Sequence, residues 1–166
     1  MAPETDDTVE WLEDDEMQSW MAVVAMLGAL PSALDGQLKR DVGVNHFEYS
    51  ILAGLSASPD HTLAMSDLAG VVFGSLSRLS HAVGRLEKRG WVERCETEAG
   101  RHQATRLTDL GRAELEVGAP SHVREVRRLL LDPLTPEEFH QLGEISRKVL
   151  DAVDPKRAAD IRRLFH

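Results

Sequence analysis

The apolar residues between positions 11 and 38 recur every three or four residues, which is the spacing of one buried stripe along a helix. They are Met17, Trp20, Met21, Val24, Leu27, Leu34 and Leu38. The pattern predicts a long first helix over Trp11 to Leu38. Pro31 lies inside it and removes one backbone donor, so a bend or local break is expected near Met26 to Leu30.

A second helix is predicted from about His46 to Ala57, because its start carries a capping signal and its interior repeats every four residues. Asn45 and Glu48 have the spacing at which each side chain accepts the other residue's backbone N–H. The core face of this helix is formed by Phe47, Ile51 and Leu55.

The middle of the chain has the pattern of two helices joined by a tight turn. A brief strand over Thr62 to Met65 leads to Ser66, which is expected to cap a short helix from Asp67 to Val72. Phe73-Gly74 then forms the turn, and Ser75 caps the next helix. Two helices joined in this way are typical of a helix-turn-helix.

A hairpin follows the second of these helices. That helix ends at Lys88-Arg89-Gly90, where cations face the C-terminal carbonyls and a glycine stops the helix. Trp91 to Cys95 and His102 to Leu107 are then predicted to be strands, joined by a polar tip that contains Gly100. A basic hairpin beside a helix-turn-helix is a wing.

The last third of the chain is predicted to be helical. Thr108 caps a helix that meets an expected bend at Gly118-Ala119-Pro120. Thr135, Pro136 and Glu138 then supply a cap, a first-turn proline and a capping-box glutamate for the last helix. Its apolar stripe consists of Phe139, Leu142, Ile145, Val149 and Val153.

These elements predict a mainly α fold: a winged helix-turn-helix domain with a two- or three-stranded wing, plus N- and C-terminal helices that form a dimerisation region. The dimer is expected because long apolar stripes on terminal helices need a cover. The predicted organisation is an acidic, flexible tail over 1–10, N-terminal helices over 11–57, the winged helix-turn-helix over 58–112 and C-terminal dimerisation helices over 113–166.

Charge is distributed unevenly along the 166 residues, whose formal net charge is −9. Such a total argues against nucleic acid, because Lys and Arg supply most non-specific affinity for phosphate. Residues 62–112, however, hold eight Lys and Arg side chains against six acidic ones. Eight acidic side chains without a basic neighbour fall within the first twenty residues. The region of the predicted wing is therefore the basic part of an acidic chain.

The sequence lacks the signals of several functional classes. It contains no glycine-rich phosphate loop, GxSxG elbow, HExxH helix or paired catalytic constellation, so no enzyme and no catalytic residue is predicted. The one cysteine, Cys95, excludes an internal disulfide. The seven histidines include no pair at ligand spacing on a predicted helix face, so neither a metal nor another cofactor is expected.

The chain is expected to be cytoplasmic. Its N-terminus is acidic and has no basic segment before an apolar run, unlike a secretory signal. The longest apolar stretch, Met21 to Leu30, is shorter than a bilayer-spanning helix requires, so no membrane partner is predicted.

The polar face of the helix after Ser75 is the candidate site for double-stranded DNA. Near its start, Ser75, Ser77, Arg78 and His81 are predicted to read base edges in the major groove. Arg78 is the candidate for a bidentate contact to guanine, because its planar fork matches both acceptors. Arg85, Lys88 and Arg94 are predicted to meet phosphates, or are solvated surface cations, and Arg101 at the wing tip is predicted to enter the minor groove.

Three segments together resemble the MarR family of bacterial transcriptional regulators over about residues 15–155. They are Ser66-Asp67-Leu68-Ala69, the passage from Arg85 to Trp91-Val92, and Leu107-Thr108-Asp109-Leu110-Gly111-Arg112. The resemblance implies a homodimer built on the first, fifth and sixth helices, a pseudo-palindromic operator, and release of DNA by a small molecule. Family wings usually carry an acid two positions before the tip arginine, where this chain has Ala99.

The resemblance also implies an effector pocket between the dimer helices and the winged domain. By position its lining would include Trp20, Met21, His46 and Tyr49, although tryptophan and methionine at helical spacing also simply fill cores. Cys95 lies on the predicted wing strand, away from the start of the first helix where thiol-sensing relatives place their cysteine.

Together the observations predict a sequence-specific DNA-binding regulator, a ligand-responsive repressor that acts as a homodimer. The alternative is a winged-helix module that uses the same surface for protein contacts, which the overall acidity of the chain favours.

Overall fold

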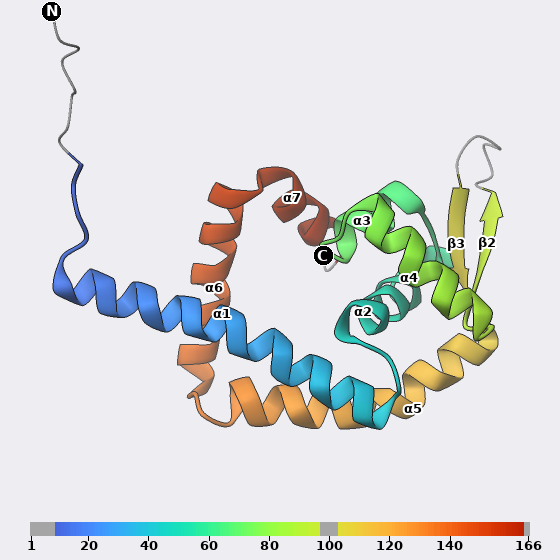
Figure 1. Ribbon diagram of the computed structural model, residues 1–166, viewed down its shortest axis with the longest axis horizontal. Coiled ribbons are helices and arrows are strands. Elements are labelled where there is room, and N and C mark those ends of the chain that lie inside the picture. The colour runs from blue at the N-terminus through green and yellow to red at the C-terminus, as the bar shows by residue number, and fades with distance from the viewer. Residues whose placement is uncertain (1–8, 97–102, 165–166) are drawn as a thin grey trace, which may run out of the picture. The chain divides into compact units, whose positions relative to one another are not determined.

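The computed structural model describes residues 9–96 and 103–164, which fall into two compact units, Met1–Ala33 and Leu34–His166 (Figure 1). In chain order the elements are α1 (Asp14–Asp41), α2 (His46–Ser56), the 3-10 turn η1 (Pro59–His61), β1 (Thr62–Ala64), α3 (Met65–Val71), α4 (Leu76–Lys88), β2 (Val92–Glu96), β3 (Gln103–Leu107), α5 (Asp109–Val126), the π-helical turn η2 (Arg127–Leu131), α6 (Pro136–Val153) and α7 (Pro155–Leu164). The predicted mainly α fold with a small winged sheet is confirmed.

α1 starts and ends later than its apolar pattern predicted. Acidic residues fill its first turn and Lys39 and Arg40 its last, a placement that the helix dipole favours at both ends. The helix runs through Pro31 without the predicted local break. Proline removes the hydrogen bond to the carbonyl of Leu27, but Leu27 is exposed, so water can satisfy that carbonyl.

The whole of α1 is longer and more apolar than its Met21 to Leu30 segment. No Asp, Glu, Lys or Arg occurs between Met17 and Leu34. By length and composition alone α1 could therefore cross a membrane, which corrects the argument drawn from the shorter stretch. The same length and composition suit a helix that pairs with another apolar surface in water.

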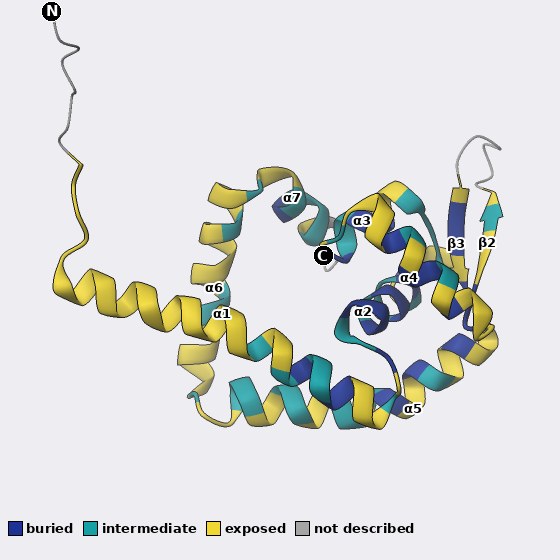
Figure 2. Cartoon of the chain, viewed as in Figure 1, coloured by how far each residue is buried: buried dark blue, intermediate teal, exposed yellow. Residues whose placement is uncertain are grey.

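The core lies among α2, α3, α4 and the sheet, where buried residues cluster (Figure 2). Its largest fully buried apolar side chains are Leu38, Val44, Ile51, Leu52, Leu55, Leu68, Leu79, Val83, Leu86 and Val92. Burial of one such side chain stabilises the fold by about 1.5–3 kcal/mol. The last turns of α1, with Leu34, Gln37 and Leu38, belong to this unit.

The sheet has three antiparallel strands in the order β1-β3-β2. Thr62 pairs with Arg106 across β1 and β3, and Val92 pairs with Leu107 across β2 and β3. β1 confirms the brief strand predicted before the helix-turn-helix, but that strand ends at Ala64.

The start of α3 differs from the prediction that Ser66 caps it. Ala64 occupies the N-cap position without a side-chain hydrogen bond, and the helix begins at Met65. The sulfur of Met65 accepts a hydrogen bond from the buried Thr105 hydroxyl at 3.1 Å. This contact with β3 draws Met65 inward, so the chain turns directly from strand into helix.

The other predicted caps are confirmed. Ser75, Thr108 and Thr135 each accept a backbone N–H from the first turn of the following helix, and Asn45 and Thr135 both form capping boxes. Gly90, which follows the C-cap of α4, has a φ of +73°. Glycine adopts this left-handed conformation without the steric cost of a Cβ, which explains why a glycine stands at the end of this helix.

The C-terminal part contains one helix that the pattern did not predict. α5 stays helical through Gly118 and Pro120, and after α6 the chain forms α7, which packs against α3 (Figure 1). At the start of α7 the Asp154 carboxylate accepts the backbone N–H of Arg157 at 3.0 Å. α7 has few large apolar residues, which is why periodicity alone missed it.

Candidate nucleic-acid interface

α4 buries one face and presents the other. Leu79, Ala82, Val83 and Leu86 are buried against the core. The residues predicted to meet DNA from this segment are all exposed, namely Ser75, Ser77, Arg78, His81, Arg85 and Lys88. We call this set the α4 face. The Ser75 hydroxyl accepts the backbone N–H of Arg78 at 3.2 Å, so the cap fixes the end from which base edges would be read.

Arg78 rests on an aromatic ring of α2. Its guanidinium carbon lies 4.1 Å from the centre of the Phe47 ring, within cation–π distance. The same ring passes close to the turn before α4, because a Cβ at Gly74 would lie 2.5 Å from Cζ of Phe47. Gly74 therefore allows the ring to reach Arg78.

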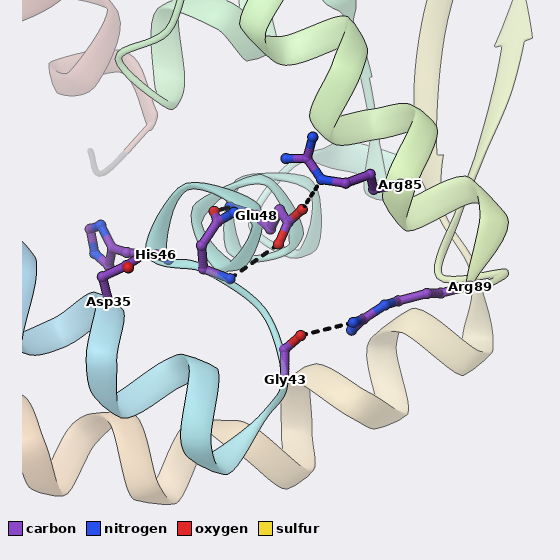
Figure 3. Close-up of polar contacts among 7 residues, drawn as sticks. Asp35, Gly43, His46, Glu48, Arg85 and Arg89 are labelled. Carbon is purple, nitrogen blue, oxygen red and sulfur yellow. Dashed lines mark hydrogen bonds and ion pairs between the residues drawn. The ribbon is translucent and has the colours of Figure 1, made fainter.

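Arg85 is paired with a buried carboxylate (Figure 3). Its Nε donates to Oε1 of Glu48 at 2.6 Å, and the Glu48 side chain is only 10% exposed whereas that of Arg85 is 55% exposed. The second oxygen of Glu48 accepts the backbone N–H of Asn45 at 3.1 Å. Glu48 thus belongs to the capping box of α2 and also binds Arg85 of α4. The local sequence pattern did not predict this second contact.

Arg89, at the end of α4, is tied to the loop between α1 and α2. Its Nη2 donates to the carbonyl oxygen of Gly43 at 2.8 Å (Figure 3). Its guanidinium carbon lies 4.8 Å from the centre of the Trp91 ring. The backbone of Gly43 has a φ of +74°. Arg89 therefore stabilises the packing of α4 against the loop between α1 and α2. It was not among the predicted site residues.

The remaining cations predicted to bind DNA differ in whether their side chains form hydrogen bonds or ion pairs within the protein. Arg94 on β2 donates to the carbonyl oxygen of Ser80 at 3.2 Å and lies 3.4 Å from Glu87, both on α4. Within residues 9–96 and 103–164, the side chains of Lys88 and His81 form no hydrogen bond or ion pair. Arg101 lies outside the described residues.

Two of the predicted effector residues meet a third residue that was not predicted. The rings of Tyr49 and His122 lie 4.6 Å apart and those of His46 and His122 6.1 Å apart, centre to centre. A nitrogen of His122 lies 3.1 Å from Oε1 of the buried Gln37. His122 comes from α5, so only the folding of α5 against α2 brings it here.

Burial is the largest cause of the pKa shifts of His46, Tyr49 and His122. It lowers the pKa of His46 below the usual range, although the charge of Asp35 acts in the opposite direction. Burial also lowers the pKa of His122, helped by the charge of His46. The pKa of Tyr49 is raised by burial. All three side chains therefore favour their neutral forms.

A largely apolar cavity of about 340 Å³ adjoins these residues between α2, α3 and α7. Its wall includes His46 and Tyr49 from α2, Val71 and Phe73 from the α3 end, and Ile161 from α7. The other two predicted effector residues, Trp20 and Met21, belong to the N-terminal unit and are exposed. The cavity has the size and character of a site for a small apolar molecule.

Comparison with known proteins identifies relatives along most of the chain. No family model matches. The chain is 32% identical over 114 residues to the transcriptional repressor MprA of Escherichia coli strain K12, covering 68% of this chain and 64% of the repressor, or slightly less than two thirds of its length. The structure resembles Sco3205 of Streptomyces coelicolor, a MarR family transcriptional regulator solved in complex with DNA, with a TM-score of 0.86 and 41% identity over 91% of this chain and 95% of that one. It also resembles AbsC, a MarR family regulator of the same organism, with a TM-score of 0.83 and 32% identity over 89% and 100% of the two chains.

Proposed function

The chain belongs to the MarR family of transcriptional regulators, and on that basis we propose that it is a sequence-specific DNA-binding repressor. The observation that carries the proposal is the α4 face, a row of exposed polar and cationic side chains on a helix whose other side is anchored in the core. A helix presented in this way fits the major groove. Sco3205, which is similar over most of its length, was solved with DNA bound.

Within this proposal the residues have separate roles. Ser75, Ser77, Arg78 and His81 lie at the capped end of α4 and read base edges. Arg85, Lys88 and Arg94 contact phosphates and so set the register of the helix on the duplex. The wing, with Arg101 at its tip, reaches the adjacent minor groove.

The protein acts as a homodimer on a pseudo-palindromic operator. Large apolar side chains are exposed on the helices outside the winged domain, and in water they require a cover. On α1 they include Met17, Trp20, Met21, Val24 and Leu27, and on α6 Ile145, Val149 and Val153. We therefore assign residues 11–57 and 113–166 to dimerisation and support, 58–112 to DNA binding, and 1–10 to an acidic tail.

A small-molecule effector releases the DNA in this proposal. The cavity beside His46 and Tyr49 supports it, because it lies between α2 and the turn that precedes α4. Trp20 and Met21, the other two residues predicted for the effector site, belong to the N-terminal unit. The relatives are transcriptional regulators, and we infer that this chain likewise has no enzymatic activity and works in the cytoplasm.

The test is binding of the purified protein to the DNA upstream of its own gene, followed by footprinting. Affinity for the footprinted duplex and for a scrambled duplex is measured at several salt concentrations. We expect preference for the footprinted site and a steep fall in affinity as salt rises. A winged-helix module that contacts only proteins would show neither.

A further inference from the structure

Two consecutive residues at the start of α2 hold two arginines of α4. The Phe47 ring supports Arg78 at 4.1 Å, and the Glu48 carboxylate binds Nε of Arg85 at 2.6 Å. Arg78 and Arg85 are about two helical turns apart, so they project from the same side of α4. The first turn of α2 therefore determines where both guanidinium groups lie.

Glu48 is itself held in place. It is buried, and its two oxygens bind different donors, Nε of Arg85 and the backbone N–H of Asn45 (Figure 3). Asn45 in turn accepts the backbone N–H of Glu48 at 2.9 Å. Because the capping box fixes the carboxylate, Arg85 must adapt to Glu48 and not the reverse.

The pairing leaves Arg85 able to bind a second anion. Within the described residues, Nε is the only atom of its guanidinium with a hydrogen bond, and the side chain is 55% exposed. A guanidinium is planar and carries five N–H donors, so an Arg held at Nε presents its Nη edge in one fixed direction. The Nη edge matches the geometry of a phosphate group.

We propose that Glu48 and Phe47 are positioning residues for DNA recognition, which orient Arg85 and Arg78 before the DNA binds. The proposal rests on the proposed function and refines it. Phosphate contacts fix the register of a recognition helix without reading sequence, whereas base contacts specify. An arginine already oriented loses less conformational freedom on binding, so correct register on the operator is favoured over other registers.

The experiment replaces Glu48 and compares specificity with affinity. Glu48→Gln is measured by fluorescence anisotropy against the footprinted duplex and a scrambled duplex over a range of salt. We expect affinity for the footprinted duplex to fall by about three- to ten-fold. Affinity for the scrambled duplex stays constant or rises, because a nearby negative charge is gone. The salt dependence is unchanged, since Arg85 still contacts phosphate.

A double-mutant cycle tests whether Glu48 acts through Arg85. In an Arg85→Gln background, Glu48→Gln is expected to cause no further loss of specificity. The matched control is Glu125→Gln, which removes the same charge and frees Arg128 on η2 from an ion pair of 2.7 Å. This control should leave the ratio of specific to non-specific affinity unchanged.

Phe47→Leu tests the other half of the proposal. The substitution keeps an apolar side chain in the core but removes the ring face beneath Arg78. We expect discrimination at the base that Arg78 reads to fall by about two- to five-fold. Discrimination at the other positions of the half-site should stay unchanged.

Several results would contradict the proposal. If folded Glu48→Gln keeps its specificity, with or without a lower melting temperature, Glu48 has a purely structural role. If Glu48→Gln loses as much specificity in the Arg85→Gln background as in the wild type, Glu48 does not act through Arg85. If Glu48→Gln does not fold, Arg85→Lys keeps the charge without Nε and must lose specificity to the same extent. A wild-type protein that binds no duplex contradicts the proposed function and the positioning role together, whereas binding with unchanged ratios contradicts the positioning role alone.

Discussion

The guanidinium of Arg89 donates to the carbonyl oxygen of Gly43 at 2.8 Å, a bond that joins the end of α4 to the loop between α1 and α2. The two residues lie 46 positions apart. The bond thus connects the helix proposed to read DNA with the segment that follows α1.

Loss of this connection is expected to destabilise the winged unit moderately. Arg89→Ala should lower the free energy of unfolding by about 0.5–1.5 kcal/mol, because the bond is exposed and solvent competes for it. The measurement is urea denaturation followed by circular dichroism. Lys88→Ala is the control and should change stability little, because the side chain of Lys88 forms no hydrogen bond or ion pair among the described residues. Equal losses in both variants would contradict the role of the Gly43 contact.

Arg78 is expected to carry base preference. Arg78→Ala should weaken binding to the footprinted duplex by about 1–3 kcal/mol and relax preference at one position in each half-site. Binding to a panel of single-base variants of the duplex measures both effects. Arg127→Ala on η2 removes the same charge outside the α4 face and should leave the preference intact. Undiminished affinity and preference in Arg78→Ala would remove Arg78 from the interface.

Gly74 is expected to tolerate no side chain. Gly74→Ala would place a Cβ 2.5 Å from Cζ of Phe47, so the ring or the turn must shift. We expect a loss of about 1–3 kcal/mol in stability, measured by thermal or urea unfolding. A Cβ at Gly84, inside α4, would meet no atom within 4 Å, so Gly84→Ala should instead stabilise the protein by about 0.5–1 kcal/mol. The two substitutions should therefore have opposite signs.

Stability is expected to fall when the pH drops below about 7. Burial lowers the pKa of His46 and of His122 in the folded protein, so over this range the unfolded chain binds more protons than the folded one. Protonation then favours unfolding, and the loss accumulates as the pH falls through the ordinary histidine pKa of about 6.5. Urea midpoints at pH 7.5 and 5.5 measure it. His122→Gln should reduce the difference between the two midpoints, and an undiminished difference would show that His122 does not contribute.

The proposed dimer is expected to depend on the apolar face of α6. Ile145 and Val149 are 56% and 57% exposed in the single chain. Ile145→Glu should shift the protein from dimer to monomer in sedimentation velocity, because a charge would be buried in the interface. His140→Glu introduces a carboxylate on another side of α6 and should leave the dimer intact. A dimer that survives Ile145→Glu would place the interface elsewhere.

Local patterns predicted most of the fold because they depend on neighbours in the chain. The caps at Asn45, Ser75, Thr108 and Thr135 were correctly predicted, since each involves atoms within three residues. The polar face predicted for the helix after Ser75 is likewise exposed in α4. Where an atom distant in the chain intervened, prediction failed, as at Met65, whose contact with Thr105 moved the start of α3.

The sequence by itself thus determined the order of the helices and strands up to α6, the caps at Asn45, Ser75, Thr108 and Thr135, the winged helix-turn-helix and which face of α4 stays polar. The tertiary structure alone decided what the cations of that face touch: Arg78 lies on Phe47, Arg85 binds Glu48 and Arg89 binds Gly43. It also brought His122 to Tyr49. The physical reason is that a cap is closed by the backbone of its own turn, whereas an arginine meets whichever group the packing of another helix places within its reach.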